Sequence, residues 1–173
     1  MPSSRDSVPA TSGVRELLER DHERLDGLLR AAAGGPGPLD AASYQEFRAG
    51  LLRHIGLEEK ILLPAARRLR GGEPLEIARQ LKLDHAALAA LLVPTPTAAI
   101  LSTLTSLLAV HNPLEEGPGG VYAVCEELAG AEVPELLARL LAAPAVPAAA
   151  HYDGERAFAA IDRLLRAAGR APA

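Results

Sequence analysis

The stretch HIGLEE at residues 54–59 decides how the chain is interpreted, because it recurs as HNPLEE at residues 111–116. Each copy follows another matched stretch, DHERLDGLL at residues 21–29 and DHAALAALL at residues 84–92. The order D-H-x-x-L-x-x-L-L and then H-x-x-L-E-E therefore occurs twice in one chain. Four of the five histidines lie inside this repeat. We interpret the repeat as two related helical hairpins.

The polar residues of the repeat fall on helix faces that are otherwise apolar. In each copy, the histidine and the first glutamate of H-x-x-L-E-E are four residues apart, so on a helix they share one face. An unpaired polar group on such a core-facing stripe costs on the order of a few kcal/mol. A cation bound between the helices removes that cost, because neutral imidazoles and carboxylates become its ligands. The predicted ligands of two metal ions are His22, His54, Glu58, His85, His111 and Glu115.

Length, charge and cysteine content narrow the class of protein. A chain of 173 residues is the size of one domain with a proper core. The 18 basic and 22 acidic residues give a net charge of −4 without a basic tract, which excludes nucleic acid and anionic membrane as expected partners. The single cysteine, Cys125, excludes an intramolecular disulfide and is expected to be a small buried residue. The first residues lack an apolar signal core, so a cytoplasmic location is expected.

The distribution of helix formers and breakers predicts an all-α chain. Alanine and leucine dominate, aromatic residues make up 3%, and β-branched residues do not alternate with polar ones. A flexible arm at residues 1–11 is expected before an up-down-up-down four-helix bundle over residues 12–130, because short breaks separate long helices. The four helices are expected at residues 12–33, 43–70, 73–93 and 96 to at least 111.

Capping and proline residues set the expected helix boundaries. Ser43 and Glu46 form a capping box at the start of the second helix. Glu73-Pro74 is expected to begin the third helix and Thr95-Pro96 the fourth. Pro64 lies inside the second helix, so it is expected to kink or loosen one turn there.

Residues 131–173 are predicted to form a C-terminal extension. A short helix is expected at 134–142, a linker at 144–147, and a last amphipathic helix from about residue 153 to residue 169. The face of the last helix that is expected to pack on the bundle comprises Ala159, Ile161, Leu164, Leu165 and Ala168.

The two-fold pattern H…H-x-x-x-E…H…H-x-x-x-E resembles the hemerythrin-like HHE cation-binding domain over roughly residues 14–128. The sequence EKILLP at residues 59–64 and Val121-Tyr122 also resemble that family's E-x-x-L-Y-P ending. The resemblance implies a four-helix bundle with a non-haem centre, usually of two irons. By the family's layout, His22 and His54 bind one metal, His85 and His111 bind the other, and Glu58 and Glu115 bridge them. Zinc or manganese also fits such mixed nitrogen and oxygen ligands.

The chain departs from the oxygen-carrying members of that family in three ways. Their fifth histidine is replaced by Leu81 or Ala89, so the second metal lacks one protein ligand. Their last carboxylate is an aspartate five residues after its histidine, whereas Glu115 is four residues after its own. Pro118 and three neighbouring glycines are expected to break the fourth helix about one turn past the ligand. These departures favour an asymmetric centre.

Several polar residues close to the repeat have more than one possible role. Glu59 and Glu116 are expected either to support the ligands or to be solvated. Asp21 and Asp84 directly precede histidines and point away from them, so solvent or a loop is their expected surrounding, with support of a ligand as the alternative. Tyr122 could reach the site, but a packing role is favoured. His151 is expected at the surface or at a helix start, with the vacant ligand position as its alternative.

Three functions fit these residues. The first is a cytoplasmic di-iron protein that binds or reacts with O2, NO or peroxide as a sensor, scavenger or iron store, and a homodimer is allowed. The second is a small di-iron oxidase or peroxidase, with the missing histidine leaving a position for turnover. The third is a structural helical bundle that holds adventitious zinc. No nucleophile elbow or phosphate-binding loop is present, so hydrolysis of an organic substrate finds no support.

Overall fold

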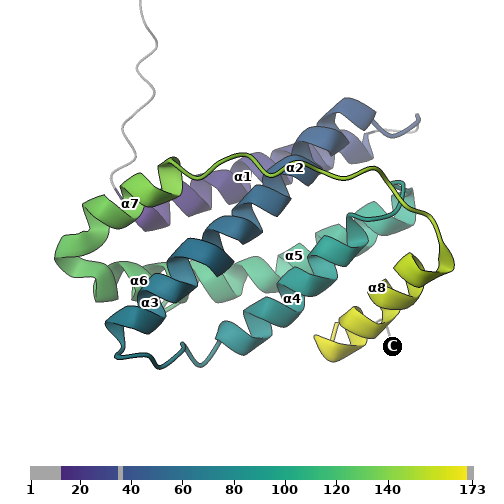
Figure 1. Cartoon of the computed structure of the whole chain (residues 1–173). Coiled ribbons are helices and arrows are strands. Elements are labelled where there is room, and N and C mark those ends of the chain that lie inside the picture. The colour runs from purple at the N-terminus through teal and green to yellow at the C-terminus, as the bar shows by residue number, and fades with distance from the viewer. Residues whose placement is uncertain (1–12, 35–36, 171–173) are drawn as a thin grey trace, which may run out of the picture.

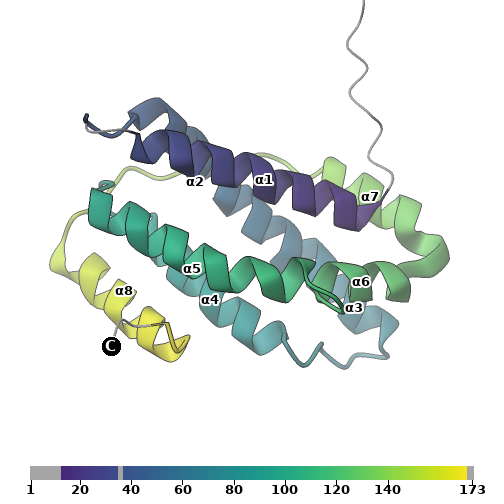
Figure 2. The same cartoon turned by 180° about the vertical axis from the view of Figure 1, so that it is seen from behind.

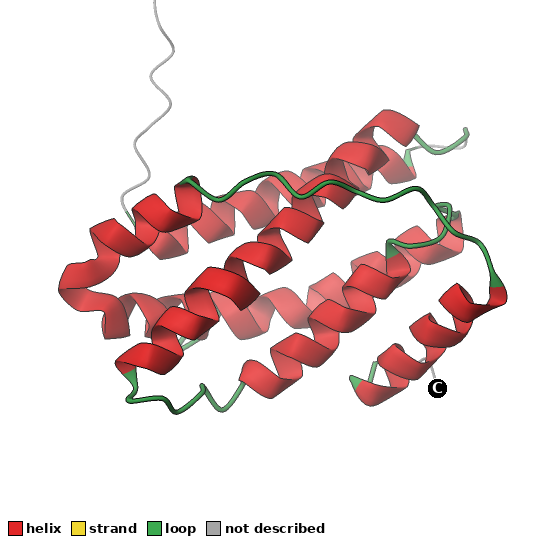
Figure 3. Ribbon diagram, viewed as in Figure 1, coloured by secondary structure: helices red, strands yellow, loops and turns green. Residues whose placement is uncertain are grey.

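The protein is described by a computed structural model that covers residues 13–34 and 37–170. Within these residues every regular element is a helix and no strand occurs, so the predicted all-α class is confirmed (Figure 3). The expected flexible arm at residues 1–11 lies outside the described residues. No described helix combines the length and the apolar character that a membrane span requires.

Four long helical segments lie side by side (Figures 1 and 2). They are α1 (Val14–Ala33); α2 (Ala41–Leu57) continued by the π-helical turn η1 (Glu58–Leu62) and α3 (Leu63–Leu69); α4 (Ala78–Leu91); and α5 (Ala98–Glu116) followed by α6 (Val121–Ala129). Helix α1 packs on α2 and α5, α4 packs on α5, and α6 packs on α3.

Three helices begin at other residues than expected. The start of α2 is capped by Asp40, whose carboxylate accepts hydrogen bonds from the backbone N–H groups of Ala42 and Ser43, so the capping box expected at Ser43 is wrong. Helix α5 is capped by Thr97, because the expected cap, Thr95, is engaged with Asp153 through its N–H and its hydroxyl. The start of α4 at Ala78 also lies beyond the expected Glu73-Pro74.

Prolines and glycines interrupt the second and fourth segments. The loosened turn expected near Pro64 is the π-helical turn η1, which ends at Leu62, two residues before this proline. Helix α5 continues through Pro113 and ends at Glu116, and the loop at residues 117–120 separates it from α6. The expected break one turn after Glu115 is therefore confirmed. Gly119 in this loop has a φ of +71°, a conformation that favours glycine.

The C-terminal part supplies two more helices and a long connection. The short 3₁₀ turn η2 (Gly130–Glu132) leads into α7 (Val133–Leu141), and the chain then crosses α2 before α8 (Glu155–Ala167) packs on α4 (Figure 1). The buried Arg48 guanidinium fixes this connection, because it donates to the carbonyl oxygens of Leu92 at 2.8 Å and Ala149 at 2.7 Å.

The buried face of α8 is close to the expected one. Leu165 and Ala168 are buried and Ile161 and Leu164 are partly buried, but Ala159 is exposed and the buried residue is Ala157. Ala157 lies four residues before Ile161 and therefore shares its face, whereas Ala159 lies only two residues before it and points elsewhere.

The apolar core is divided into two clusters. One is centred on Leu18, Leu62, Tyr122 and Leu140, and the other on Phe47, Leu88 and Leu104. Each histidine of the repeat lies between a leucine of one cluster and a leucine of the other along its helix. In α1, for example, His22 lies between Leu18 and Leu25. A polar layer therefore lies between two apolar ones.

Candidate metal centre

The six predicted ligand residues converge in the polar layer. Helix α1 supplies His22, α2 supplies His54, η1 supplies Glu58, α4 supplies His85, and α5 supplies His111 and Glu115. None of the six is more than 6% exposed. The expectation that the repeat points its polar side chains inward is confirmed, and their role as ligands stays a prediction.

The potential ligand atoms form two groups that share a carboxylate. The first group comprises His22, His54, Glu58 and Glu115, and the second comprises His85, His111 and Glu115. Within each group the ligand atoms lie within 4.8 Å of one another. Each group therefore combines two imidazoles with carboxylate oxygen in a space that a single ion could fill.

Glu58 connects the two groups from the start of the π-helical turn. Its Oε1 lies 3.3 Å from His54 Nε2, and its Oε2 lies 3.1 Å from His85 Nε2. The first of these pairs is the expected one-turn spacing on a single helix, and the second crosses to α4. π-Helical turns are rare in proteins as a whole, but those that occur are frequently found at functional sites. This one begins at Glu58, the residue that links both groups.

Glu115 connects the groups from the other side, near the end of α5. Its Oε2 lies 3.5 Å from His22 Nε2, and its Oε1 lies 3.3 Å from His111 Nε2. Pro113 is accommodated inside the helix, and α5 ends one residue after Glu115. The prolines and glycines of this stretch therefore leave the carboxylate in the centre.

Each imidazole is held from behind by a further carboxylate on its Nδ1 atom. The distances are 2.5 Å for His22 and Glu116, 2.9 Å for His54 and Asp21, 3.1 Å for His85 and Glu59, and 3.3 Å for His111 and Asp84. A carboxylate only accepts hydrogen bonds, so each Nδ1 carries the proton that it donates. In a neutral ring the lone pair then resides on Nε2, which faces the centre. Metal-binding histidines are usually supported in this way.

The supporting carboxylates follow the repeat. Each aspartate holds the second histidine of its own repeat, as Asp21 does for His54. Each last glutamate holds the first histidine of the other repeat, as Glu59 does for His85. The expectation that Asp21 and Asp84 face solvent or a loop is therefore wrong. They do point away from the histidines beside them, but a histidine of a neighbouring helix lies in that direction.

The centre contains buried polar atoms that the protein does not satisfy. Glu58 Oε2, His85 Nε2 and Glu115 Oε1 are buried and make no hydrogen bond. Glu58 Oε2 and His85 Nε2 lie 3.1 Å apart, but their orientation does not meet the requirements of a hydrogen bond. Leaving such groups unpaired is costly, and carboxylate oxygens and imidazole Nε2 atoms are ligands for divalent iron, manganese or zinc. The residues therefore fit a pair of metal ions, which the four outer carboxylates would hold in place through the histidines.

The carboxylates give the centre a strongly negative potential. Burial opposes charge on His54, yet Glu58 and Asp21 raise the pKa of this imidazole to about 10. Burial likewise opposes charge on His85, while the nearby carboxylates of Glu115, Glu58 and Glu59 raise its pKa to about 11. Protons thus collect on these two imidazoles where cations are absent, whereas burial and the neighbouring His54 lower the pKa of His22. Metal ions compete with protons for the same nitrogens, so a divalent ion satisfies this potential equally well.

The structure also places three residues whose roles the sequence left open. The hydroxyl of Tyr122, which is 0% exposed, lies among the ligand atoms of the first group, so the favoured packing role is incomplete. His151 lies 3.0 Å from Gln45 Nε2 and beside the ring of Tyr44, outside both groups, so it does not fill a ligand position. Cys125 is buried, as expected.

The C-terminal extension reaches the centre through Arg170, which sequence reasoning missed. Its Nε and one terminal nitrogen each lie 3.1 Å from a carboxylate oxygen of Asp84, and Gln80 donates to the same carboxylate at 2.9 Å. Burial opposes charge on Asp84, but His111, Arg170 and Gln80 lower its pKa to about 2. The two-pronged contact fixes the carboxylate that orients His111. A separation of 86 residues along the chain gave no signal for it.

Replacing Asp84 by asparagine is expected to weaken the binding of one metal ion roughly 10- to 100-fold, because His111 loses a charged support. Competition with a coloured chelator measures the affinities of the two ions separately. Asp26→Asn in α1 is the matched control, since Asp26 is exposed and pairs with Arg30 but with no histidine. Equal metal affinity in Asp84→Asn and Asp26→Asn would contradict a supporting role for Asp84.

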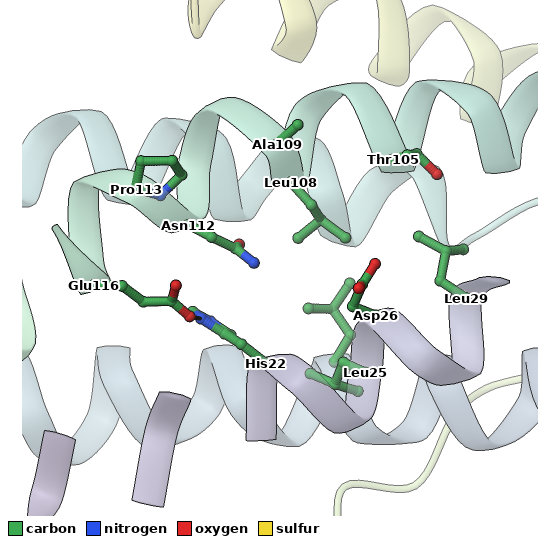
Figure 4. A pocket seen from close by; sticks show the side chains of 11 residues that line it. His22, Leu25, Asp26, Leu29, Thr105, Leu108, Ala109, Asn112, Pro113 and Glu116 are labelled. Carbon is green, nitrogen blue, oxygen red and sulfur yellow. Dashed lines mark hydrogen bonds and ion pairs between the residues drawn. The ribbon is translucent and has the colours of Figure 1, made fainter. Parts of the chain in front are cut away.

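A pocket of about 270 Å³ lies between α1 and α5 and leads to the centre (Figure 4). Four leucines, Leu25, Leu29, Leu51 and Leu108, line it, and the hydrogen-bonded pair of His22 and Glu116 lies at one end. Figure 4 shows the amide of Asn112 pointing toward this end and Ala109 on the α5 wall. The space is large enough for a small molecule and is mainly apolar, which favours neutral ligands.

Fold and site together define a helical protein with a buried histidine and glutamate cluster that could bind metal ions. Comparison of the chain with protein-family models, with curated proteins and with solved structures finds no match. The residues of the site are therefore the basis for the function proposed below.

Proposed function

We propose that the chain is a four-helix bundle of hemerythrin type that binds two iron ions and uses them to bind or react with O2, NO or peroxide. The bundle comprises residues 12–130, and residues 131–173 are an extension that packs on it. The observation that carries the proposal is the set of buried atoms without a hydrogen bond at the junction of the two groups, Glu58 Oε2, His85 Nε2 and Glu115 Oε1. A pair of bridged cations is the simplest partner for them.

The charges of the residues support two ions rather than one. Two inner carboxylates and four outer ones surround four imidazoles, and the only guanidinium groups bound to these carboxylates among the described residues are those of Arg24 on Asp21 and Arg170 on Asp84. Glu58, Glu115 and Asp84 are buried, and an excess of buried negative charge is unfavourable without cations. Zinc and manganese satisfy the same donors, so iron is proposed for its redox chemistry.

The ions would supply redox change and open coordination positions, while the protein holds, orients and encloses them. His22 and His54 would bind one ion, His85 and His111 the other, and Glu58 and Glu115 would bridge them. Each Nδ1–H stays on its carboxylate, which keeps the ring from turning and its Nε2 directed inward. The leucine layers on both sides exclude water, so small neutral molecules are favoured over ions.

Metal content and reactivity test the proposal together. Protein purified without added metal is expected to contain two irons per chain by elemental analysis, corresponding to the two groups of ligands. Addition of NO or air to the reduced protein is expected to change its absorption spectrum. Zinc alone, or no metal, would contradict the proposal. Sustained consumption of peroxide would favour the oxidase or peroxidase instead, for which Leu81 and Ala89 speak, because neither supplies the fifth histidine and a position on the second ion stays open.

The pocket between α1 and α5 is proposed as the access route for the small ligand. Ala109→Trp is expected to slow the reaction with NO roughly 10-fold, because an indole at the exposed rim fills the mouth while metal content stays unchanged. Stopped-flow absorption measures the rate. Ala99→Trp is the control, since Ala99 is exposed on the same helix and does not line this pocket. Equal rates in both variants would exclude this route.

A further inference from the structure

We propose that the phenol oxygen of Tyr122 is a direct ligand of the ion held by His22 and His54. This inference rests on the proposed metal centre and deepens it, because it makes the two ions chemically different. It gives the first ion five protein donors and leaves the second ion with four.

The first observation is the position of the hydroxyl. It lies 3.1 Å from His22 Nε2, 3.1 Å from His54 Nε2, 2.5 Å from Glu58 Oε1 and 3.2 Å from Glu115 Oε2. These are all the ligand atoms of the first group. Neighbouring ligands of a six-coordinate ion with bonds of about 2.1 Å are separated by about 3 Å. The phenol oxygen therefore lies at the distance from each of the four atoms that a fifth ligand has.

The second observation is a shortage of protons. A phenol carries one O–H, so it donates to only one of the four atoms around it. Each imidazole already uses its Nδ1–H on a carboxylate, and the two carboxylates have no hydrogen to give. Unless His54 takes up a second proton, five atoms that carry lone pairs thus converge on one proton. A cation among them reconciles all five at once.

The third observation is that the hydroxyl serves one group alone. The buried atoms without a hydrogen bond, Glu58 Oε2, His85 Nε2 and Glu115 Oε1, all belong to the side of the second ion. In the register of the repeat, Tyr122 follows Glu115 by seven residues, and the residue seven after Glu58 is Ala65. The first repeat therefore offers no oxygen at the matching position. The second ion is therefore left with fewer protein donors than the first.

Tyr122 is also fixed in place. It is fully buried and is the second residue of α6, directly after the loop at residues 117–120 that separates α6 from α5. Its ring lies 5.6 Å from that of His22. Burial and the nearby carboxylates Glu58 and Glu115 raise the pKa of this phenol well above its ordinary value in the absence of metal. Coordination to a ferric ion would replace the phenol proton by the metal, with the proton released to solvent.

Absorption and resonance Raman spectra of the oxidised, iron-loaded protein test the inference. Phenolate bound to ferric iron gives a visible charge-transfer band, and excitation in that band enhances tyrosine ring vibrations. Tyr122→Phe is expected to abolish both and to weaken the binding of one ion about 10-fold or more. Tyr44→Phe is the matched control, because Tyr44 is equally buried and lies in the other apolar cluster. It is expected to keep the spectrum of the unmodified protein.

The outcomes separate this inference from the proposed function. Two irons per chain without a phenolate signal, or a signal that survives in Tyr122→Phe, would overturn the tyrosine ligand and leave the metal centre standing. An unmodified protein that binds no iron would overturn the proposed function itself, and the ligand with it. Incorporation of ring-deuterated tyrosine is expected to shift the enhanced vibrations, and a lack of any shift would assign the band to another ligand and overturn the inference.

Discussion

Replacing Glu58 by glutamine is expected to reduce the iron content from two ions per chain to fewer than one. Like Glu115, Glu58 approaches a histidine of each group, His54 through Oε1 and His85 through Oε2. Glutamine keeps the size of the side chain but is neutral, and its nitrogen has no lone pair for a metal. The loss of a bridging ligand should exceed the roughly 10- to 100-fold effect of removing a supporting residue. Elemental analysis after gel filtration measures the remaining iron.

Glu46→Gln provides the control for this experiment. Glu46 lies in the same helical segment as Glu58, one charge is removed in both variants, and Glu46 is exposed. Circular dichroism checks that both variants keep their helical content. Two tightly bound irons in Glu58→Gln would rule out a bridging role for this carboxylate.

Removal of the metal is expected to lower the melting temperature by roughly 5–15 °C. A ligand present at 100 to 1,000 times its dissociation constant stabilises the folded state by about 3–4 kcal/mol. In a chain of this size, each kcal/mol shifts the melting temperature by about 2–4 °C. The metal-free chain is expected to stay helical, because the apolar clusters on both sides of the centre do not depend on the ions. Thermal melts followed by circular dichroism, with and without chelator, measure the shift.

The His54→Ala variant makes this result specific. It lacks one ligand of the first group, so the chelator should change its melting temperature less than that of the unmodified chain. A general effect of the chelator on the protein would shift both equally. If the chelator removes the iron from the unmodified protein and its melting temperature stays the same, the ions do not stabilise the fold.

The convergence of the six inner residues could be predicted from the sequence because a helix converts spacing into direction. The pairs His54 and Glu58, and His111 and Glu115, are one turn apart on apolar faces, and the repeat of the pattern brings the two pairs together. Composition predicted the helical class, and Pro118 with its neighbouring glycines predicted the break after Glu116. Helix starts were less accurate, because the caps Asp40 and Thr97 compete with other suitable residues only a few positions away.

The supporting residues could not be predicted in the same way, because their partners lie on other helices. Asp21 and Asp84 point away from their sequence neighbours, and only the packing of the helices shows which histidine each one meets. Their repetition together with the histidines was the available signal. Tyr122 depends on the loop before α6, and Arg170 depends on how α8 packs on α4. Spacing along the chain does not specify either arrangement.

The most direct test of the central claim is an anomalous-scattering map, recorded at the iron absorption edge, of crystals grown from protein purified without added metal. Two peaks are expected inside the bundle, one beside His22 and His54 and one beside His85 and His111, with Glu58 and Glu115 between them. An interior without a peak, or iron bound only at the surface, would contradict the account.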